Sequence, residues 1–316
     1  MSWGATWGAD PLGLLLAVVL TGGYAAGVLA ARRRGTTWSW GRTAVYVVLG
    51  VGSLVLATCG ALAAYRGTLF SVGAAQATVL SAVAPLGLAL GDPLGLARGA
   101  WPPLGRGVGP GLTRLGRVAM FPLVSSVVAA GVLVVLFFTP WFASSLTTAW
   151  VRELLYVVLL LTGTLVVLPL LSTELLPSWC THPVRAFLPF VDGLIDAVPG
   201  ILVMTTPRLL TVGVGAAGLT HRTWGPAPMW DQRLGGAVML AIAETVGLPL
   251  LAAVMVAWMR ADAAEARRVD VELDAQRARG RVASTPGTPS TPGAEGEPGR
   301  DRPWWESDPR FSRFRD

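Results

Sequence analysis

Long apolar runs dominate the chain and predict membrane-spanning helices. A helix needs about 20 mainly apolar residues to cross the hydrocarbon core of a bilayer, and seven runs meet that length. They are Leu12–Ala31, Thr43–Ala64, Thr68–Leu90, Val118–Phe138, Val151–Leu171, Ala186–Thr206 and Gly235–Met259. The pattern therefore predicts an all-α fold, a polytopic membrane bundle of seven transmembrane helices.

Arginines in the connections between these runs predict the orientation of the chain. Four arginines from Arg32 to Arg42 follow the first run, Arg66 alone follows the second, and four more follow the third. Short arginine-rich loops face the cytoplasm, so we expect the N-terminus outside and the C-terminus inside. The connection from Pro207 to Leu234 is expected outside although it contains three arginines, because its two tryptophans are typical of interfacial anchors.

Composition supports a membrane protein. Of the 316 residues, 53% are hydrophobic and only 14% are charged, where an average soluble domain has about 25% charged residues. The formal charge of +6 comes from arginines, since the chain contains no lysine, and they cluster in loops and in the tail. We interpret them as topology signals that contact the lipid bilayer, so nucleic acid is not an expected partner.

The residues after the last apolar run predict two further parts of the chain. Residues 1–260 form the expected transmembrane domain, and residues 261–282, rich in Ala, Glu and Arg, are expected to extend the last helix into the cytoplasm. Residues 283–316 contain the string TPGTPSTPG, which cannot bury a core, and are expected to be disordered.

Signals of soluble enzymes are missing, so we expect no catalytic activity. The sequence has no Walker-type loop, no Cys-x-x-Cys and no Gly-x-Ser-x-Gly. His182 and His221 lie in loops expected on opposite faces of the membrane and cannot form one metal site. Cys180 and His182 make two ligands without a third, which is usually incidental. A disulfide between Cys59 and Cys180 is not expected, because they belong to different regions.

Ionisable residues inside the apolar runs are the candidates for function, because charge at bilayer depth is costly. Asp196 lies ten residues before the end of its run, about 15 Å from that end along a helix, and we expect Tyr156 and Glu244 at similar depths. They could form a substrate or ion site, or pair with one another to fix helix packing. The expected polar cluster consists of Arg152, Glu153, Tyr156, Asp192, Asp196 and Glu244.

Several strings, read together, resemble the CtaG family of cytochrome oxidase assembly factors, the multi-span type of bacterial plasma membranes. The resemblance covers roughly Tyr24 to Asp274, with WSWGR, YRGTLFS, SAVAPLGLALGDP and FFTPWFASSL as supporting strings. Its most specific part begins with the Asp-Gln pair of the last apolar run. The family pattern matches Asp231, Gln232, Gly236, Glu244, Pro249 and Trp258.

The resemblance implies a role in building a haem-copper oxidase, with copper handled by histidines in the outer half of the membrane. In this chain Gly73 and Ala77 stand at the His-x-x-x-His pair of the third run, and other residues replace the remaining histidines. These other positions are Arg152, Tyr156 and Asp196. We therefore expect no bound metal or cofactor, and hypothesise that Arg152 and Asp196 form an ion pair in the former metal cavity.

The leading interpretation is a bacterial plasma-membrane assembly factor that binds cytochrome c oxidase subunits and has a degenerate copper site. The alternative is a small-cation or proton-coupled transporter, in which Asp192, Asp196 and Glu244 line one pathway. Seven helices with intramembrane acids fit both interpretations, so the sequence alone does not distinguish the assembly factor from the transporter.

Overall fold

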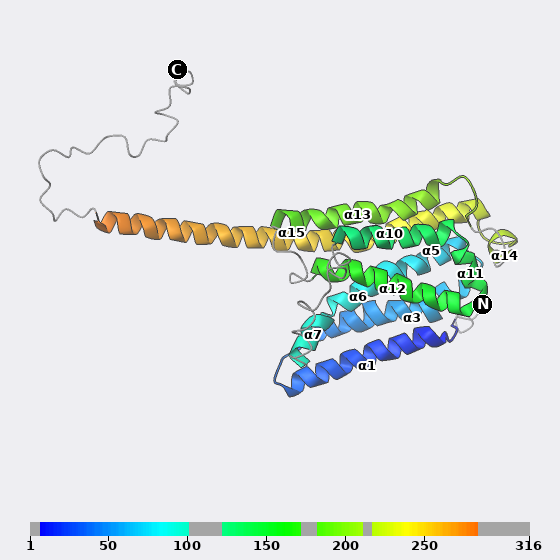
Figure 1. Ribbon diagram of the computed structural model, residues 1–316, viewed down its shortest axis with the longest axis horizontal. Helices are drawn as coiled ribbons and strands as arrows, with labels where there is room; N and C mark the ends of the chain where they lie inside the picture. Colours follow the sequence, from blue (N-terminus) through cyan, green and yellow to red (C-terminus); the bar gives the residue numbers. More distant parts are fainter. Residues whose placement is uncertain (1–6, 101–121, 172–181, 211–216, 284–316) are drawn as a thin grey trace, which may run out of the picture. The chain divides into compact units, whose positions relative to one another are not determined.

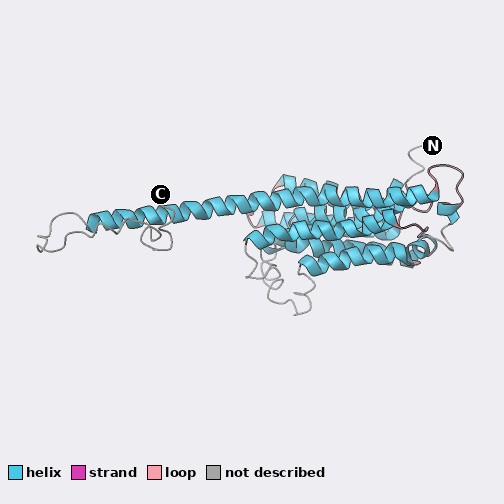
Figure 2. Cartoon of the chain, turned by 90° about the horizontal axis from the view of Figure 1, so that it is seen from above, coloured by secondary structure: helices cyan, strands magenta, loops and turns pink. Residues whose placement is uncertain are grey.

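The computed structural model describes residues 7–100, 122–171, 182–210 and 217–283, and these residues contain helices and no strand (Figures 1 and 2). The chain divides into two units, residues 1–259 and 260–316, and each is described by itself. Cys180 and the expected disordered tail beyond Ala283 lie outside the described residues.

The first expected span is one continuous helix, and the second and third are each interrupted by a short π-helical segment. Helix α1 (Pro11–Arg33) begins after Asp10, whose carboxylate accepts a hydrogen bond from the backbone N–H of Gly13 at 2.9 Å. The next span consists of α2 (Trp40–Val45), η2 (Tyr46–Val51), α3 (Gly52–Cys59) and α4 (Ala61–Tyr65). The third consists of α5 (Phe70–Thr78), η3 (Val79–Val83) and α6 (Ala84–Leu90), followed by α7 (Pro93–Ala100).

The remaining helices include one sharp bend. Helix α10 (Pro122–Phe138) and helix α11 (Trp141–Thr147) meet at 68°, and Pro140 between them has no N–H to continue the helical ladder. The later elements are α12 (Ala149–Leu171), α13 (His182–Thr205), α14 (Ala217–Thr220) and α15 (Pro228–Ala283). His182, expected in a loop, is instead the first residue of α13.

In the described residues, four helices are long and apolar enough to cross a membrane, or five if the bent pair α10 and α11 counts as one span. The four are Pro11–Arg33, Trp40–Tyr65, Phe70–Ala100 and Ala149–Leu168. The sixth and seventh expected runs coincide with helical residues of α13 and α15. The all-helical class is confirmed, whereas seven crossings and their orientation stay predictions.

Small residues let the backbones of neighbouring helices approach closely within the first unit. A Cβ atom on Gly87 would lie 2.2 Å from the backbone nitrogen of Gly50, so α6 and η2 pack backbone against backbone. A Cβ on Gly236 would lie 2.6 Å from the carbonyl oxygen of Gly200, which joins α15 to α13 in the same way. Van der Waals contact of this kind drives association where lipid is as apolar as the side chains.

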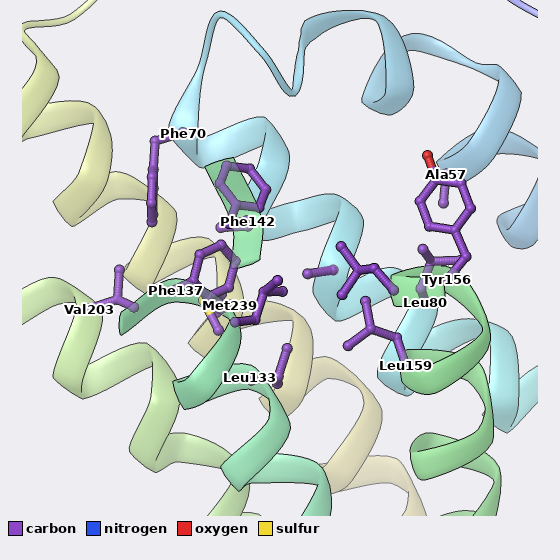
Figure 3. Packing of buried hydrophobic residues seen from close by; sticks show 14 of the residues in the cluster. Ala57, Phe70, Leu80, Leu133, Phe137, Phe142, Tyr156, Leu159, Val203 and Met239 are labelled. Carbon is purple, nitrogen blue, oxygen red and sulfur yellow. The ribbon is translucent and has the colours of Figure 1, made fainter. Parts of the chain in front are cut away.

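The largest apolar cluster joins α5, α10, α11, α12 and α15. Phe137 lies at its centre, with ring centroids 5.2 Å from Phe70 and 5.3 Å from Phe142. Figure 3 shows these three rings on one side and Tyr156 with Leu159 on the other. Helix α10 packs against both α12 and α13 (Figure 1). The core therefore holds the polar residues described next in fixed positions.

Candidate functional site

Arg66 is the centre of a buried polar network. It follows α4, and its side chain turns inward, so that only 5% of the residue is exposed. One terminal nitrogen, Nη2, donates to the carbonyl oxygen of Ser145 at 2.6 Å and to its hydroxyl at 3.0 Å. The other, Nη1, donates to Gln76 Oε1 at 3.3 Å and to Tyr156 Oη at 3.2 Å. Burial lowers the pKa of Arg66, and the Tyr156 hydroxyl opposes this shift.

Gln76 closes the network. Its amide nitrogen donates to the carbonyl oxygen of Ala57 at 2.6 Å and to the hydroxyl of Tyr156 at 3.2 Å. The guanidinium carbon of Arg66 also lies 5.9 Å from the centroid of the Tyr156 ring. A single set of hydrogen bonds thus links α3, α5, α11 and α12, and satisfies polar groups that burial would otherwise penalise.

Arg152 pairs with Asp10, and the hypothesis that it pairs with Asp196 is wrong. Its Nε atom lies 3.3 Å from Oδ2 of Asp10, a residue that is 8% exposed and caps α1. This approach is close enough for an ion pair but lacks hydrogen-bond geometry, and the buried Nε has no hydrogen-bond partner among the described residues. Asp10 precedes the first apolar run, so a search restricted to the runs overlooks it.

A cavity of about 410 Å³ lies beside this network, and we call it the arginine cavity. Among its lining residues are Trp7, Asp10, Thr58, Arg66, Arg152 and Tyr156. Two guanidinium groups and one carboxylate border it, so the lining carries a net positive charge at neutral pH.

Two of the positions where the resemblance implies histidines, Gly73 and Ala77, are tightly packed. A Cβ on Gly73 would lie 2.4 Å from the Phe142 ring, so the phenyl group fills the space that a larger side chain would need. Ala77, one turn later, is 3% exposed in the apolar cluster. Among the described residues, no three His, Cys, Asp or Glu side chains are grouped so that they could hold a metal.

Asp192 and Asp196 border a second, smaller cavity of about 50 Å³, which has room for a few water molecules. Asp192 is 7% exposed and accepts a hydrogen bond from the hydroxyl of Ser126 on α10. Met239 of α15 also lines this cavity. Asp196 and Tyr156 therefore line different cavities, and the expected shared site between them is not formed.

The two glutamates of the expected cluster lie apart from both cavities. Glu244 is exposed on α15, and Glu153 is half-buried on α12. Neither residue lines the arginine cavity or the cavity of the two aspartates. The three acids of the transporter interpretation therefore do not share the cavity that Asp192 and Asp196 border.

Asp231, the first residue of the motif in α15, fastens that helix to the start of α5. The side chain is fully buried and accepts hydrogen bonds from the backbone N–H of Phe70 at 2.7 Å and of Ser71 at 3.3 Å. Leu69 at the N-cap of α5 provides no side-chain hydrogen bond, so Asp231, about 160 positions away in the sequence, caps this helix instead. Arg222 neutralises the carboxylate, with Nη2 3.1 Å from Oδ2 of Asp231.

The other motif residues that the structure describes also hold backbone in place. Gln232 accepts a hydrogen bond from the N–H of Leu210 at 2.8 Å and donates to the carbonyl oxygen of Arg208 at 3.0 Å. Gly236 makes the close contact with α13, and Pro249 lies inside α15 beside an apolar groove. The side chain of Trp258 is outside the described part. Asp231, Gln232 and Gly236 therefore contribute to the fold, whereas Glu244 of the same motif is exposed.

Curated relatives that match this chain come from mycobacteria. The uncharacterized proteins Mb0105 of Mycobacterium bovis and MT0111 of Mycobacterium tuberculosis are each 31% identical over 281 residues, which cover 86% of this chain and 42% of the relative. The protein ML1998 of Mycobacterium leprae is 28% identical over 277 residues, 85% of this chain and 42% of its own length. This chain thus spans about two fifths of the length of these relatives.

The comparison with protein families is more informative. No solved structure gives a significant match. Residues 22–261 match the cytochrome c oxidase caa3 assembly factors, a group that is not defined by catalysis. Because the matched region covers most of the chain and includes the Asp231 contacts, this protein belongs to the cytochrome c oxidase caa3 assembly factor family, Caa3_CtaG.

Proposed function

We propose that this protein assists the assembly of a haem-copper cytochrome c oxidase in a bacterial plasma membrane and acts by binding oxidase subunits. Membership of the family over residues 22–261 is the observation that carries the proposal. In this account the chain crosses the membrane seven times, with its N-terminus outside and its C-terminus in the cytoplasm.

The side chains at the family's histidine positions argue for a degenerate copper site. Phe142 packs against Gly73 where an imidazole would need room, and Arg152 and Tyr156 are engaged with Asp10 and Arg66. A guanidinium in place of an imidazole repels a metal cation. A protein with these residues can still serve as a scaffold, because the buried network and the Asp231 contacts keep its helices in fixed positions.

Glu244 indicates where a partner would bind. It lies nine residues after Gly235 and 15 before Met259, about 13 and 22 Å along a helix. A span between these ends is about 37 Å long, so Glu244 lies inside a hydrocarbon core about 30 Å thick whenever the span crosses the whole core. An exposed carboxylate at that depth is costly unless another molecule covers it.

The residues around Glu244 form an apolar face, which we call the Glu244 face. It consists of Leu234, Ala241, Glu244, Leu248 and Met255, all exposed and spaced along one side of α15. We propose that a transmembrane helix of an oxidase subunit packs on this face and supplies a hydrogen-bond donor or a cation to the carboxylate. Membrane helices commonly use polar groups in this way.

Site-specific crosslinking tests the proposal. A photoreactive residue replaces Leu248 in the chain expressed in cells that make the oxidase, and the crosslinked products are identified by mass spectrometry. An oxidase subunit captured at Leu248, and absent when the probe replaces the exposed Val18 of α1, supports partner binding. Equal capture at both positions, or capture of lipid alone at Leu248, contradicts it.

A further inference from the structure

We propose that the arginine cavity binds a small oxyanion of the phosphate type, either free or as part of a lipid headgroup. This site is separate from the Glu244 face, and its existence does not depend on the proposed role in oxidase assembly. The inference rests on the charges, the volume and the free hydrogen-bonding capacity of the cavity lining.

The charges of the lining are unbalanced. All hydrogen-bond acceptors found for the Arg66 guanidinium are neutral groups, belonging to Gln76, Ser145 and Tyr156. The one carboxylate that borders the cavity, Asp10, lies 3.3 Å from Arg152 and also accepts the N–H of Gly13. Glu153, next to Arg152 in sequence, does not line the cavity. One positive charge is therefore left without a partner, and burial strengthens its attraction for an anion.

The hydrogen-bonding capacity of Arg152 also favours binding of an anion. Its buried Nε lacks a hydrogen-bond partner among the described residues, and its side chain is 29% exposed at the cavity. The planar guanidinium fork matches two oxygens of a phosphate or carboxylate group at once. An oxyanion in the cavity would approach Arg152 from its exposed side and accept hydrogen bonds from the guanidinium.

The volume and position of the cavity fit a phosphate group. About 410 Å³ is more than a few water molecules need. Trp7 lines the cavity and is 57% exposed, and Trp150, two residues before Arg152, is 67% exposed. Tryptophan is enriched at the level of the lipid headgroups, so both a headgroup phosphate and a free phosphate from the aqueous side can reach the arginines.

Binding of inorganic phosphate to the purified full chain in a neutral detergent tests the site. At constant ionic strength, we expect saturable binding to the wild type, at least tenfold weaker binding to Arg152→Gln, and several-fold tighter binding to Asp10→Asn. The tighter binding of Asp10→Asn cannot result from misfolding, so the test does not depend on a variant that merely fails to fold. The control Arg42→Gln removes a half-exposed arginine paired with Asp92 elsewhere, and should bind as the wild type does.

The source of the phosphate is distinguished in nanodiscs. If a headgroup is the ligand, adding phosphatidylglycerol to phosphatidylcholine discs lowers the affinity for inorganic phosphate in the wild type but not in Arg152→Gln. If a free anion is the ligand, the affinity is the same in both lipid mixtures. Absence of binding to both phosphate and phosphatidylglycerol, or equal binding by the wild type, Arg152→Gln and Asp10→Asn, would overturn the proposal.

Discussion

Arg66, in the turn after α4, donates a hydrogen bond to the hydroxyl of Tyr156 on α12 across 3.2 Å. The two residues are 90 positions apart, so this bond ties the second expected span to the fifth. Ser145 and Gln76 complete the set of acceptors around the same guanidinium. The stability of the bundle should therefore depend on Arg66 more than on any exposed arginine.

Replacing Arg66 with alanine tests that dependence. The change leaves the buried oxygens of Gln76 and Ser145 without their donors, and hydrogen bonds to charged groups contribute about 1.5–3 kcal/mol each. We expect a loss of about 3 kcal/mol in the free energy of unfolding, measured by denaturant titration in detergent. Arg42→Ala, which breaks a half-exposed pair with Asp92, should cost less than about 1 kcal/mol. Similar losses for both variants would contradict a structural role for the Arg66 network.

Asp231 and Arg222 should be energetically coupled, because both are almost completely buried at 3.1 Å. Asp231→Asn and Arg222→Gln should each lower the free energy of unfolding by about 3 kcal/mol, since each leaves one charge unpaired. The double variant should lose less than the sum, with a coupling energy of about 1–3 kcal/mol. The exposed pair Arg277 and Asp274 on α15 provides the control, where we expect coupling below about 1 kcal/mol. If the two losses simply add, Asp231 and Arg222 do not stabilise each other, and the prediction is wrong.

The approximate positions of the helices along the chain could be predicted from the sequence, because the length of an apolar run is enough to indicate a span. The interruptions could not be predicted in the same way. The turn before α7 depends on Asp92, which has φ 51° and caps the N–H of Gly95, and the bend before α11 occurs at Pro140. The seventh expected run is helical but carries an exposed acid, Glu244, a feature that apolar length does not reveal.

The candidate site was predicted only in part. Arg152 and Tyr156 do border one cavity, but their partners Asp10 and Arg66 lie outside the apolar runs, where the search for functional ionisable residues does not reach. Gln76, a long polar side chain inside an apolar run, was the one available signal for a buried network. Arg222 was considered only for its effect on orientation. Which cation meets which acid depends on how the loops fold back over the bundle, and the spacing within one run does not contain that information.

The space beside Gly73 can be tested by adding a methyl group. Gly73→Ala should lower the free energy of unfolding by about 1–3 kcal/mol, because the new Cβ meets the Phe142 ring in a packed core. Gly22→Ala on α1 is the matched control, since a Cβ there meets nothing within 4 Å, and replacing glycine inside a helix stabilises it by about 0.5–1 kcal/mol. A stabilising effect at Gly73 would show that the site has room for a larger side chain.

Copper content directly tests the proposed loss of the copper site. We expect the purified protein, after incubation with copper(I) and desalting, to retain far less than one copper per chain by elemental analysis. The double substitution Gly73→His and Ala77→His should not restore binding, because Phe142 occupies the space that the first imidazole needs. Stoichiometric copper in the wild-type protein would contradict the account of these positions.

Substitutions of Glu244 separate partner binding from stability. Glu244 is exposed, so Glu244→Gln and Glu244→Lys should leave the unfolding midpoint unchanged in detergent. If a partner helix supplies a cation or a donor to the carboxylate, Glu244→Gln should reduce oxidase assembly several-fold, and Glu244→Lys should reduce it further through like-charge repulsion. Glu265→Gln, another exposed acid on the same helix, should have no effect. Unchanged oxidase levels in both Glu244 variants would exclude this face as the contact.

The oxidase activity of cells that lack this protein tests the central claim most directly. Membranes of a deletion strain should show a large loss of cytochrome c oxidase activity and of spectroscopically detectable oxidase haem, and expression of the wild-type chain should restore both. Normal activity and normal haem content in the deletion strain would contradict a role in oxidase assembly.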